Sequence, residues 1–244
     1  MNNLGDRMKE YEKVSDFRLQ RKIPVIGRLD RKAFHTLTRN LERPFDDNFH
    51  RCMVAATTEL CKKVQGCRIG YTQSDEITIL LADWATFTTD AWFGYRVQKM
   101  CSVAASLASV AFNAAWDSYF GGPSMNDAVF DARFWNLTKD EVNNCFLWRQ
   151  RDAEKNSISM LAQAHYSHKQ LHKKNSSDKQ DMLMELNPPI NWNDIETWQK
   201  RGTAVHKIDY TIGEASRSKW VENLETPIFS KDPDYINSLL SYGR

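Results

Sequence analysis

Two acidic residues, Asp75 and Glu76, interrupt a stretch that otherwise has the composition of buried strands, CRIGYTQSDEITILL (67–81). β-Branched and aromatic residues dominate both of its arms, and QSDE between them has the composition of a hairpin turn. An earlier apolar run, IPVIGRLD (23–30), also ends on an acid, Asp30. Carboxylates placed at the ends of buried strands are candidate ligands for a hard cation.

The elements that must position these carboxylates can be read along the chain from apolar periodicity and helix caps. Asp46 or Asp47 is a candidate cap for the first long helix, and Gly66 is a candidate stop. The expected elements are a charged helix at about 4–18, a strand at 23–30, a helix at 45–65, hairpin strands at 68–72 and 77–81, a helix at about 90–119, a strand at 128–136 and a helix from Thr138 to about 172.

After the opening helix, this order is β-α-β-β-α-β, the ferredoxin-like arrangement. We therefore predict an α+β fold: a polymerase-palm or ferredoxin-like sheet with long helices and a C-terminal helical extension. Residues 1–137 form the predicted palm-type catalytic domain, and residues 138–244 form the extension, packed on the palm.

In such a sheet the first strand lies beside the hairpin, so Asp30 and Asp75 are expected to meet over one face. Two like charges at that range repel each other unless a cation lies between them. Mg²⁺, which prefers oxygen ligands, is the natural occupant, and a palm with paired ions catalyses in-line displacement at phosphorus. The residues alone also allow a structural interpretation, in which SDE is a solvated turn and Asp30 is a cap.

Composition limits the class of protein further. The chain has 244 residues, of which 41% are hydrophobic and 26% charged, so it can bury a large core. A net charge of +2 gives no global attraction to nucleic acid. Five cysteines without CxxC spacing and a charged N-terminus favour a reducing, cytoplasmic compartment. The longest uncharged apolar run, 100–116, is shorter than a membrane span, so no membrane association is expected.

Seven ordered motifs resemble those of the tRNA-His guanylyltransferase family, and in detail those of its bacterial-type "like proteins", which repair tRNA 5′ ends. The motifs are RLDRKAFH (28–35), RPFDD (43–47), YTQSDEITILL (71–81), YRVQKM (95–100), FDARFW (130–135), WRQRDAEKNSIS (148–159) and NWNDIETWQKRGT (191–203). The resemblance runs from about residue 5 to 207 and more loosely beyond. It implies a palm with a C-terminal extension that contacts RNA, a homotetramer, and nucleotide addition in the 3′→5′ direction.

The resemblance also implies roles for individual residues. The implied catalytic residues are Asp30, Asp75 and Glu76, and two Mg²⁺ ions are held by Asp30, Asp75 and the backbone carbonyl of Arg31. The implied nucleotide-binding residues are Arg31, Lys32, Ala33, Phe34, His35, Ser74, Arg96 and Lys99. The residues implied to contact the activated 5′ end or the RNA are Arg43, Asp46, Asp152, Asn156, Lys200 and Arg201.

Two departures from the family pattern bear on mechanism. Arg31 stands where the family has glycine; it can replace a carbonyl ligand, but it would be strained if the position requires a positive φ. The family's His-x-Asn-Asn core, used for untemplated G addition, is replaced here by Glu154, Lys155, Asn156 and Ser157. This departure resembles the like proteins, whose addition is directed by pairing to the opposing tRNA strand.

The expected function is therefore a template-directed 3′-5′ nucleotidyltransferase that adds nucleotides to the 5′ end of truncated tRNA. Its substrates are ATP and other NTPs, and it acts either after ATP activation or on a 5′-triphosphate. Two alternatives remain open. A GGDEF-like nucleotide cyclase shares the element order, although the chain lacks a Gly-Gly before the acid. The second alternative is a non-catalytic family member that binds RNA or nucleotide. It is suggested by Arg31 at the position of the family glycine.

Overall fold

The computed structural model describes residues 3–31, 41–86, 88–122, 128–213 and 215–241. Its centre is a six-stranded antiparallel sheet in the order β4-β1-β3-β2-β5-β6. The first four strands along the chain are β1 (Val25–Arg31), β2 (Cys67–Gln73), β3 (Glu76–Leu81) and β4 (Phe130–Asn136). β1 lies between β4 and the β2–β3 hairpin, so the predicted α+β palm order is confirmed.

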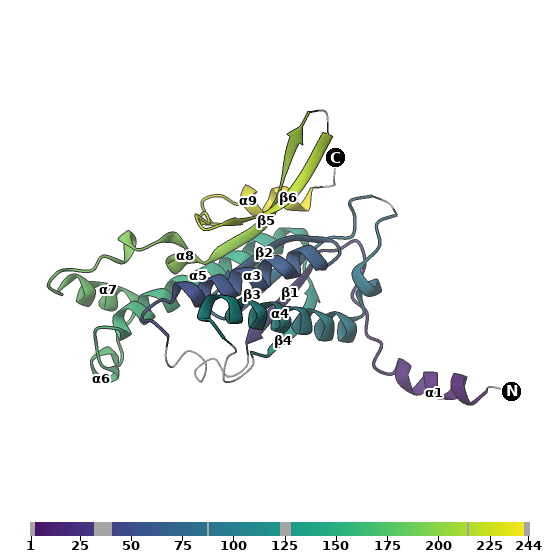
Figure 1. The fold of residues 1–244 in the computed structure, drawn as a ribbon, viewed down its shortest axis with the longest axis horizontal. Coiled ribbons are helices and arrows are strands. Elements are labelled where there is room, and N and C mark those ends of the chain that lie inside the picture. The colour runs from purple at the N-terminus through teal and green to yellow at the C-terminus, as the bar shows by residue number, and fades with distance from the viewer. Residues whose placement is uncertain (1–2, 32–40, 87, 123–127, 214, 242–244) are drawn as a thin grey trace.

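Alternation along the strands gives the sheet two apolar faces. Val25 and Leu29 pack with α3 (Asp47–Lys63) and α4 (Val97–Phe120), which cover one face (Figure 1). Ile26 and its neighbours face α5 (Lys139–Gln163) and the C-terminal segment. Burial on both sides explains why these strands read as nearly continuous apolar runs.

Local chemistry sets the helix ends. Asp46 is the N-cap of α3, as predicted, and its Oδ1 accepts a hydrogen bond of 2.8 Å from the backbone N–H of Phe49. A short 3₁₀ turn, η2 (Trp92–Tyr95), precedes α4, which ends at Gly121 with φ +74°. α5 ends at Gln163, earlier than the predicted 172, because the side chains of Ser167 and Gln170 form a capping box that starts α6 (His168–Leu171).

The rest of the extension contains both helices and strands. The helical elements are α7 (Ser176–Met184), η3 (Trp192–Asp194), α8 (Thr197–Arg201), α9 (Asp234–Asn237) and η4 (Ser238–Leu240). Two strands that the sequence analysis did not predict, β5 (Thr203–Ile212) and β6 (Ala215–Asn223), also belong to it. β5 pairs with β2 only as far as His206, and the remainder of the hairpin projects from the sheet (Figure 1).

The opening helix α1 (Leu4–Lys13) is shorter than predicted and buries none of its residues; it lies away from the sheet (Figure 1). None of the helices in the described residues combines the length and apolarity needed to cross a bilayer.

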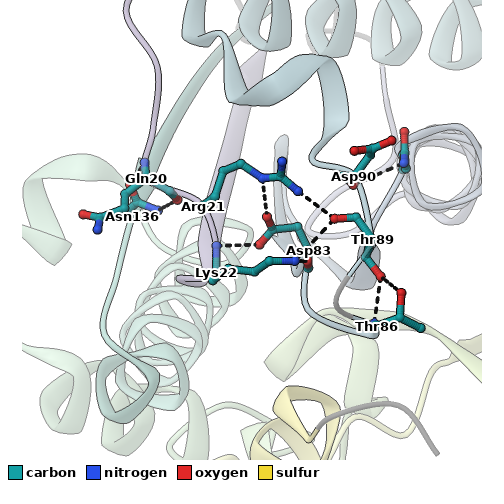
Figure 2. A network of polar contacts seen from close by, with 9 residues as sticks. Gln20, Arg21, Lys22, Asp83, Thr86, Thr89, Asp90 and Asn136 are labelled. Atoms are coloured by element: carbon teal, nitrogen blue, oxygen red, sulfur yellow. Dashed lines mark hydrogen bonds and ion pairs between the residues drawn. The ribbon is translucent and has the colours of Figure 1, made fainter.

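A buried carboxylate fixes the chain just before β1 (Figure 2). Asp83, 1% exposed, accepts hydrogen bonds from the Arg21 Nε at 3.0 Å and the Lys22 backbone N–H at 2.8 Å. The Arg21 Nη2 also donates to the Thr89 carbonyl at 2.7 Å. These contacts join the segment before β1 to the loop after β3, at the sheet end opposite Asp30.

Candidate active site

Three carboxylates lie side by side on neighbouring strands, at the end of the sheet opposite Asp83. Asp30, near the end of β1, lies directly across from Glu76 on β3 and from Asp131 on β4. Directly opposed residues of antiparallel strands project to the same face, here the face toward α5. Asp75 precedes Glu76 in the turn, where Ser74 has φ +50°. Register alone reveals Asp131, which the sequence analysis did not single out.

The structure brings Asp30 and Asp75 close enough to influence each other. Burial raises the pKa of the Asp75 carboxyl, and the negative charge of Asp30 raises it further, while the positive charge of Arg31 opposes both effects. Within the described ranges, no group of three or more His, Cys, Asp or Glu side chains converges on one point. Asp30 and Asp75 are the two acids joined by this interaction, and a pair of carboxylates is the type of donor set that Mg²⁺ completes with substrate phosphate oxygens.

Glu76 is held by a buried arginine that the sequence analysis missed. The Nε of Arg149 donates to the Glu76 Oε1 at 2.6 Å, and its Nη2 donates to the Asp152 Oδ2 at 2.8 Å. Asn156 in turn donates to the Asp152 Oδ2 at 3.5 Å. Burial raises the pKa of Glu76, and the charge of Arg149 counteracts that rise. The available signal was spacing, because Arg149 lies three residues before Asp152 on one helical face.

Arg31 fits the glycine position of the family without backbone strain. It is the last residue of β1, in extended conformation, and pairs with Phe130 on β4. Its side chain is 6% exposed, and the guanidinium carbon lies 5.8 Å from the centre of the Phe112 ring. The Nε and Nη1 atoms are buried without a hydrogen-bond partner in the described part of the chain. The predicted residues Lys32, Ala33, Phe34 and His35 lie outside the described residues.

A cavity of about 420 Å³ opens between α5, the β2–β3 turn and the segment before α3. It brings together four predicted site residues from three parts of the sequence, Arg43, Asp46, Ser74 and Asn156. The carboxylate of Asp46 is already engaged, because it accepts from the backbone N–H groups of Phe49 and of Glu42.

One wall of this cavity is aromatic. The His50 ring stacks on the Trp198 ring with centroids 4.0 Å apart, and the His50 Nε2 lies 2.8 Å from the Thr203 Oγ1. Burial lowers the pKa of His50 to about 4. A neutral aromatic wall beside polar side chains suits a ligand that has both a base and phosphates.

Arg96 and Lys99 are not brought to the acids within one chain. The Nε of Arg96 lies 3.1 Å from the Asp16 Oδ1, and the Lys99 Nζ lies 4.8 Å from the centre of the Phe93 ring. Both residues are at the start of α4, whereas Phe112, beside Arg31, lies two thirds of the way along it. At 1.5 Å per residue the helix rises about 24 Å between Arg96 and Phe112 and about 20 Å between Lys99 and Phe112.

Lys200 and Arg201 are engaged inside the extension. The Lys200 side chain is buried, and its ammonium donates to the Asn193 carbonyl. Arg201 donates from Nε to the Thr226 carbonyl at 3.4 Å, and its own carbonyl accepts from the Tyr71 hydroxyl at 2.6 Å. These contacts leave the Lys200 ammonium directed into the protein and away from solvent.

A β-α-β-β-α-β sheet with carboxylates at the adjacent ends of β1 and β3, beside a polar and aromatic cavity, defines a palm-type nucleotidyltransferase. Residues 5–138 match the family model described as tRNAHis guanylyltransferase. The chain is 42% identical to a bacterial tRNA-His guanylyltransferase-like protein in complex with ATP, with TM-score 0.91, covering 98% of this chain and all of that one. A second such structure, in complex with GTP, is 39% identical, with TM-score 0.85 over 98% and 99% of the two chains.

Two curated relatives are similar to most of this chain. An uncharacterized protein of Acanthamoeba polyphaga mimivirus is 31% identical over 98% of this chain and 88% of its own length. A probable tRNA-His guanylyltransferase of Drosophila melanogaster is 26% identical over 85% of this chain and 75% of its own length. The chain belongs to the tRNA-His guanylyltransferase family and is a nucleotidyltransferase acting at tRNA 5′ ends.

Proposed function

We propose that this protein repairs truncated tRNA by adding nucleotides to its 5′ end in the 3′→5′ direction, with the opposing tRNA strand as template. The observation that carries the proposal is the meeting of Asp30 and Asp75 at one end of the sheet. The adjacent cavity of about 420 Å³ supports it, because that volume accommodates a nucleotide. Solved structures of similar proteins contain ATP or GTP.

The paired carboxylates fit a divalent cation. Asp30 and Asp75 would hold two Mg²⁺ ions together with the backbone carbonyl of Arg31, which the extended backbone allows. Bound Mg²⁺ would supply positive charge to phosphate oxygens during an in-line displacement. Arg149 holds Glu76 on the same face as Asp30, so Glu76 would act as a further acid close to the cation.

The chemistry then requires positioning and charge stabilisation, with no covalent protein intermediate. The 3′-hydroxyl of an incoming NTP attacks the 5′ phosphorus of the tRNA and gives up its proton to solvent water. A new P–O bond forms, and the bond to AMP breaks at an adenylated end, or the bond to pyrophosphate breaks at a triphosphate. Arg43, Ser74 and Asn156, which line the cavity, would contact phosphate or ribose oxygens. Arg96 and Lys99 are left out of this single-chain site because of their distance from it.

The test is incorporation of labelled nucleotides into a tRNA that lacks its first 5′ residue, in the presence of Mg²⁺ and ATP. The wild type is expected to add the nucleotide that pairs with the opposing base. Asp30→Asn and Asp75→Asn should each lower the rate by at least about 10³-fold, because they remove charge that holds the cation. Asp209→Asn, on the exposed part of β5, is the matched control and should retain activity.

Other outcomes would identify the alternatives. A wild type that binds truncated tRNA but adds nothing to any end would support the non-catalytic interpretation. Release of a cyclic nucleotide from ATP or GTP without RNA would support the cyclase.

A further inference from the structure

A second pair of like charges lies on the same sheet face, behind the acids. Arg28 on β1 is directly opposite Arg133 on β4, two residues back from the pair formed by Asp30 and Asp131. The Arg133 side chain is 50% exposed and contacts Asp131 at 3.2 Å. The β4 edge of this face is therefore open to solvent beside the candidate active site.

Each arginine faces an acid, since the charge of Arg28 favours the ionised form of Glu76 and Arg133 contacts Asp131, yet the two arginines also face each other. Like charges directly opposite each other on neighbouring strands are destabilising. The Nε of Arg28 is also buried without a hydrogen-bond partner in the described ranges, although its guanidinium lies against the Trp148 ring. Arg133 has one donor engaged by Asp131, and its half-exposed guanidinium leaves its remaining donors open to solvent. Two guanidinium groups beside the acids proposed to hold the cation are a candidate site for further phosphates.

Trp148 on α5 completes this surface. Its side chain is 53% exposed, unusual for the largest apolar residue, while its ring is held by two guanidinium groups. The centre of that ring is 5.5 Å from the guanidinium carbon of Arg28 and 4.3 Å from that of Arg149. Because Arg149 also bonds Glu76, the ring is fixed relative to the acids. A fixed, half-exposed aromatic ring among arginines is a stacking platform of the kind used for single-stranded nucleic acid.

We propose that Arg28, Arg133 and Trp148 bind the RNA strand that leads to the reacting end, with a base stacked on Trp148 and phosphates on the two arginines. The inference rests on the proposed function and names a contact surface within it. From Arg28 to Asp30 the strand advances about 7 Å, which matches two stacked bases at 3.4 Å each. None of the three residues lines the nucleotide cavity, so the RNA strand and the incoming nucleotide occupy different places.

The test compares Trp148→Ala and Trp148→Phe for binding of a labelled 5′-truncated tRNA, followed by fluorescence anisotropy. The alanine variant should bind at least about 10-fold more weakly, and the phenylalanine variant should retain most of the affinity, because stacking needs only an aromatic face. Affinity for ATP should not change in either. RNA should also quench less of the intrinsic fluorescence in Trp148→Phe than in the wild type.

Arg133→Gln provides an independent variant, since the side chain is half exposed and its ion pair with Asp131 is a surface pair that contributes little to stability. It should weaken RNA binding and lower the slope of log affinity against log salt by about 1, as expected for the loss of one phosphate contact. Tyr11→Ala and Arg7→Gln, both on the exposed helix α1, are the matched controls and should bind RNA like the wild type.

Unchanged RNA affinity in both Trp148→Ala and Arg133→Gln would overturn the inference while leaving the proposed function intact, provided the wild type still extends truncated tRNA. Weaker ATP binding with normal RNA binding would instead assign the platform to the incoming nucleotide. A change in sedimentation coefficient caused by Trp148→Ala would assign it to a subunit interface. A wild type that fails to bind tRNA would overturn both the inference and the proposed function.

Discussion

The Nε of Arg149 lies 2.6 Å from the Oε1 of Glu76, and this ion pair fastens α5 to the sheet end that carries the acids. The Arg149 side chain is 8% exposed and that of Glu76 10%, so water screens the pair little. Arg149 thereby links the Glu76 carboxylate on β3 to Asp152, Asn156 and Trp148 on the helix.

Arg149→Met should lower the free energy of unfolding by about 3 kcal/mol, because it leaves the buried Glu76 carboxylate without its charged partner. Adding Glu76→Gln should recover part of that loss, since the remaining buried charge is removed. Urea unfolding of both single variants and of the double variant gives the coupling energy directly. Additive effects of the two changes would show that the pair makes no cooperative contribution.

Gly202 should tolerate no side chain. It has φ +70° and ψ −170°, a region used almost only by glycine, and an added Cβ would lie 2.3 Å from the Thr72 carbonyl oxygen. Gly202→Ala is expected to lower stability by about 3 kcal/mol or more. Gly213→Ala is the matched control, because Gly213 also has positive φ (+60°) but an added Cβ meets no atom within 4 Å. Equal melting temperatures for the two variants would rule out the clash.

Acid should destabilise the protein through His50. Its pKa is about 4 when folded and about 6.5 when unfolded, so between these values the unfolded chain binds the extra proton. The stability that neutral His50 contributes is therefore complete above pH 6.5 and is lost as the pH falls. By pH 5 the loss amounts to at most about 2 kcal/mol. The measurement is urea unfolding from pH 8 to pH 5 for the wild type and His50→Gln. The variant should show a smaller decline, and an identical decline would exclude His50 as its source.

The network around Asp83 predicts a loss of anchoring for the chain before β1. Asp83→Ala removes the acceptor for Arg21 and for the Lys22 backbone, and should cost about 3 kcal/mol because the donors lose a buried charged partner. Hydrogen exchange should rise first in residues 18–24 while the Glu76 end of the sheet stays protected. Asp90→Ala, at an exposed position of the same loop, serves as the control. Uniform exchange across the sheet would argue against local anchoring.

The order of elements and the Asp30 and Asp75 pair could be predicted from the sequence, because strand alternation, helix caps and turn residues are local signals. The α3 cap at Asp46 and the hairpin at 67–81 followed from the same chemistry. β5 and β6 were not predicted, since their strongly polar, exposed outer halves lack the apolar alternation of a half-buried strand. The end of α5 was placed too late because α6 follows it after a short break. The composition of residues 164–172 does not show that Ser167 starts a separate helix.

What only the tertiary structure decided is which distant residues share one face. Sheet register placed Asp131 beside Asp30 and Arg133 beside Arg28, and α5 packing brought Arg149 to Glu76. The length of α4 separated Arg96 and Lys99 from the acids, although their motif stands among the others in sequence. The sequence determined the elements and their chemistry through interactions between near neighbours. The distances between those elements depend on packing across the whole sheet, which no local pattern specifies.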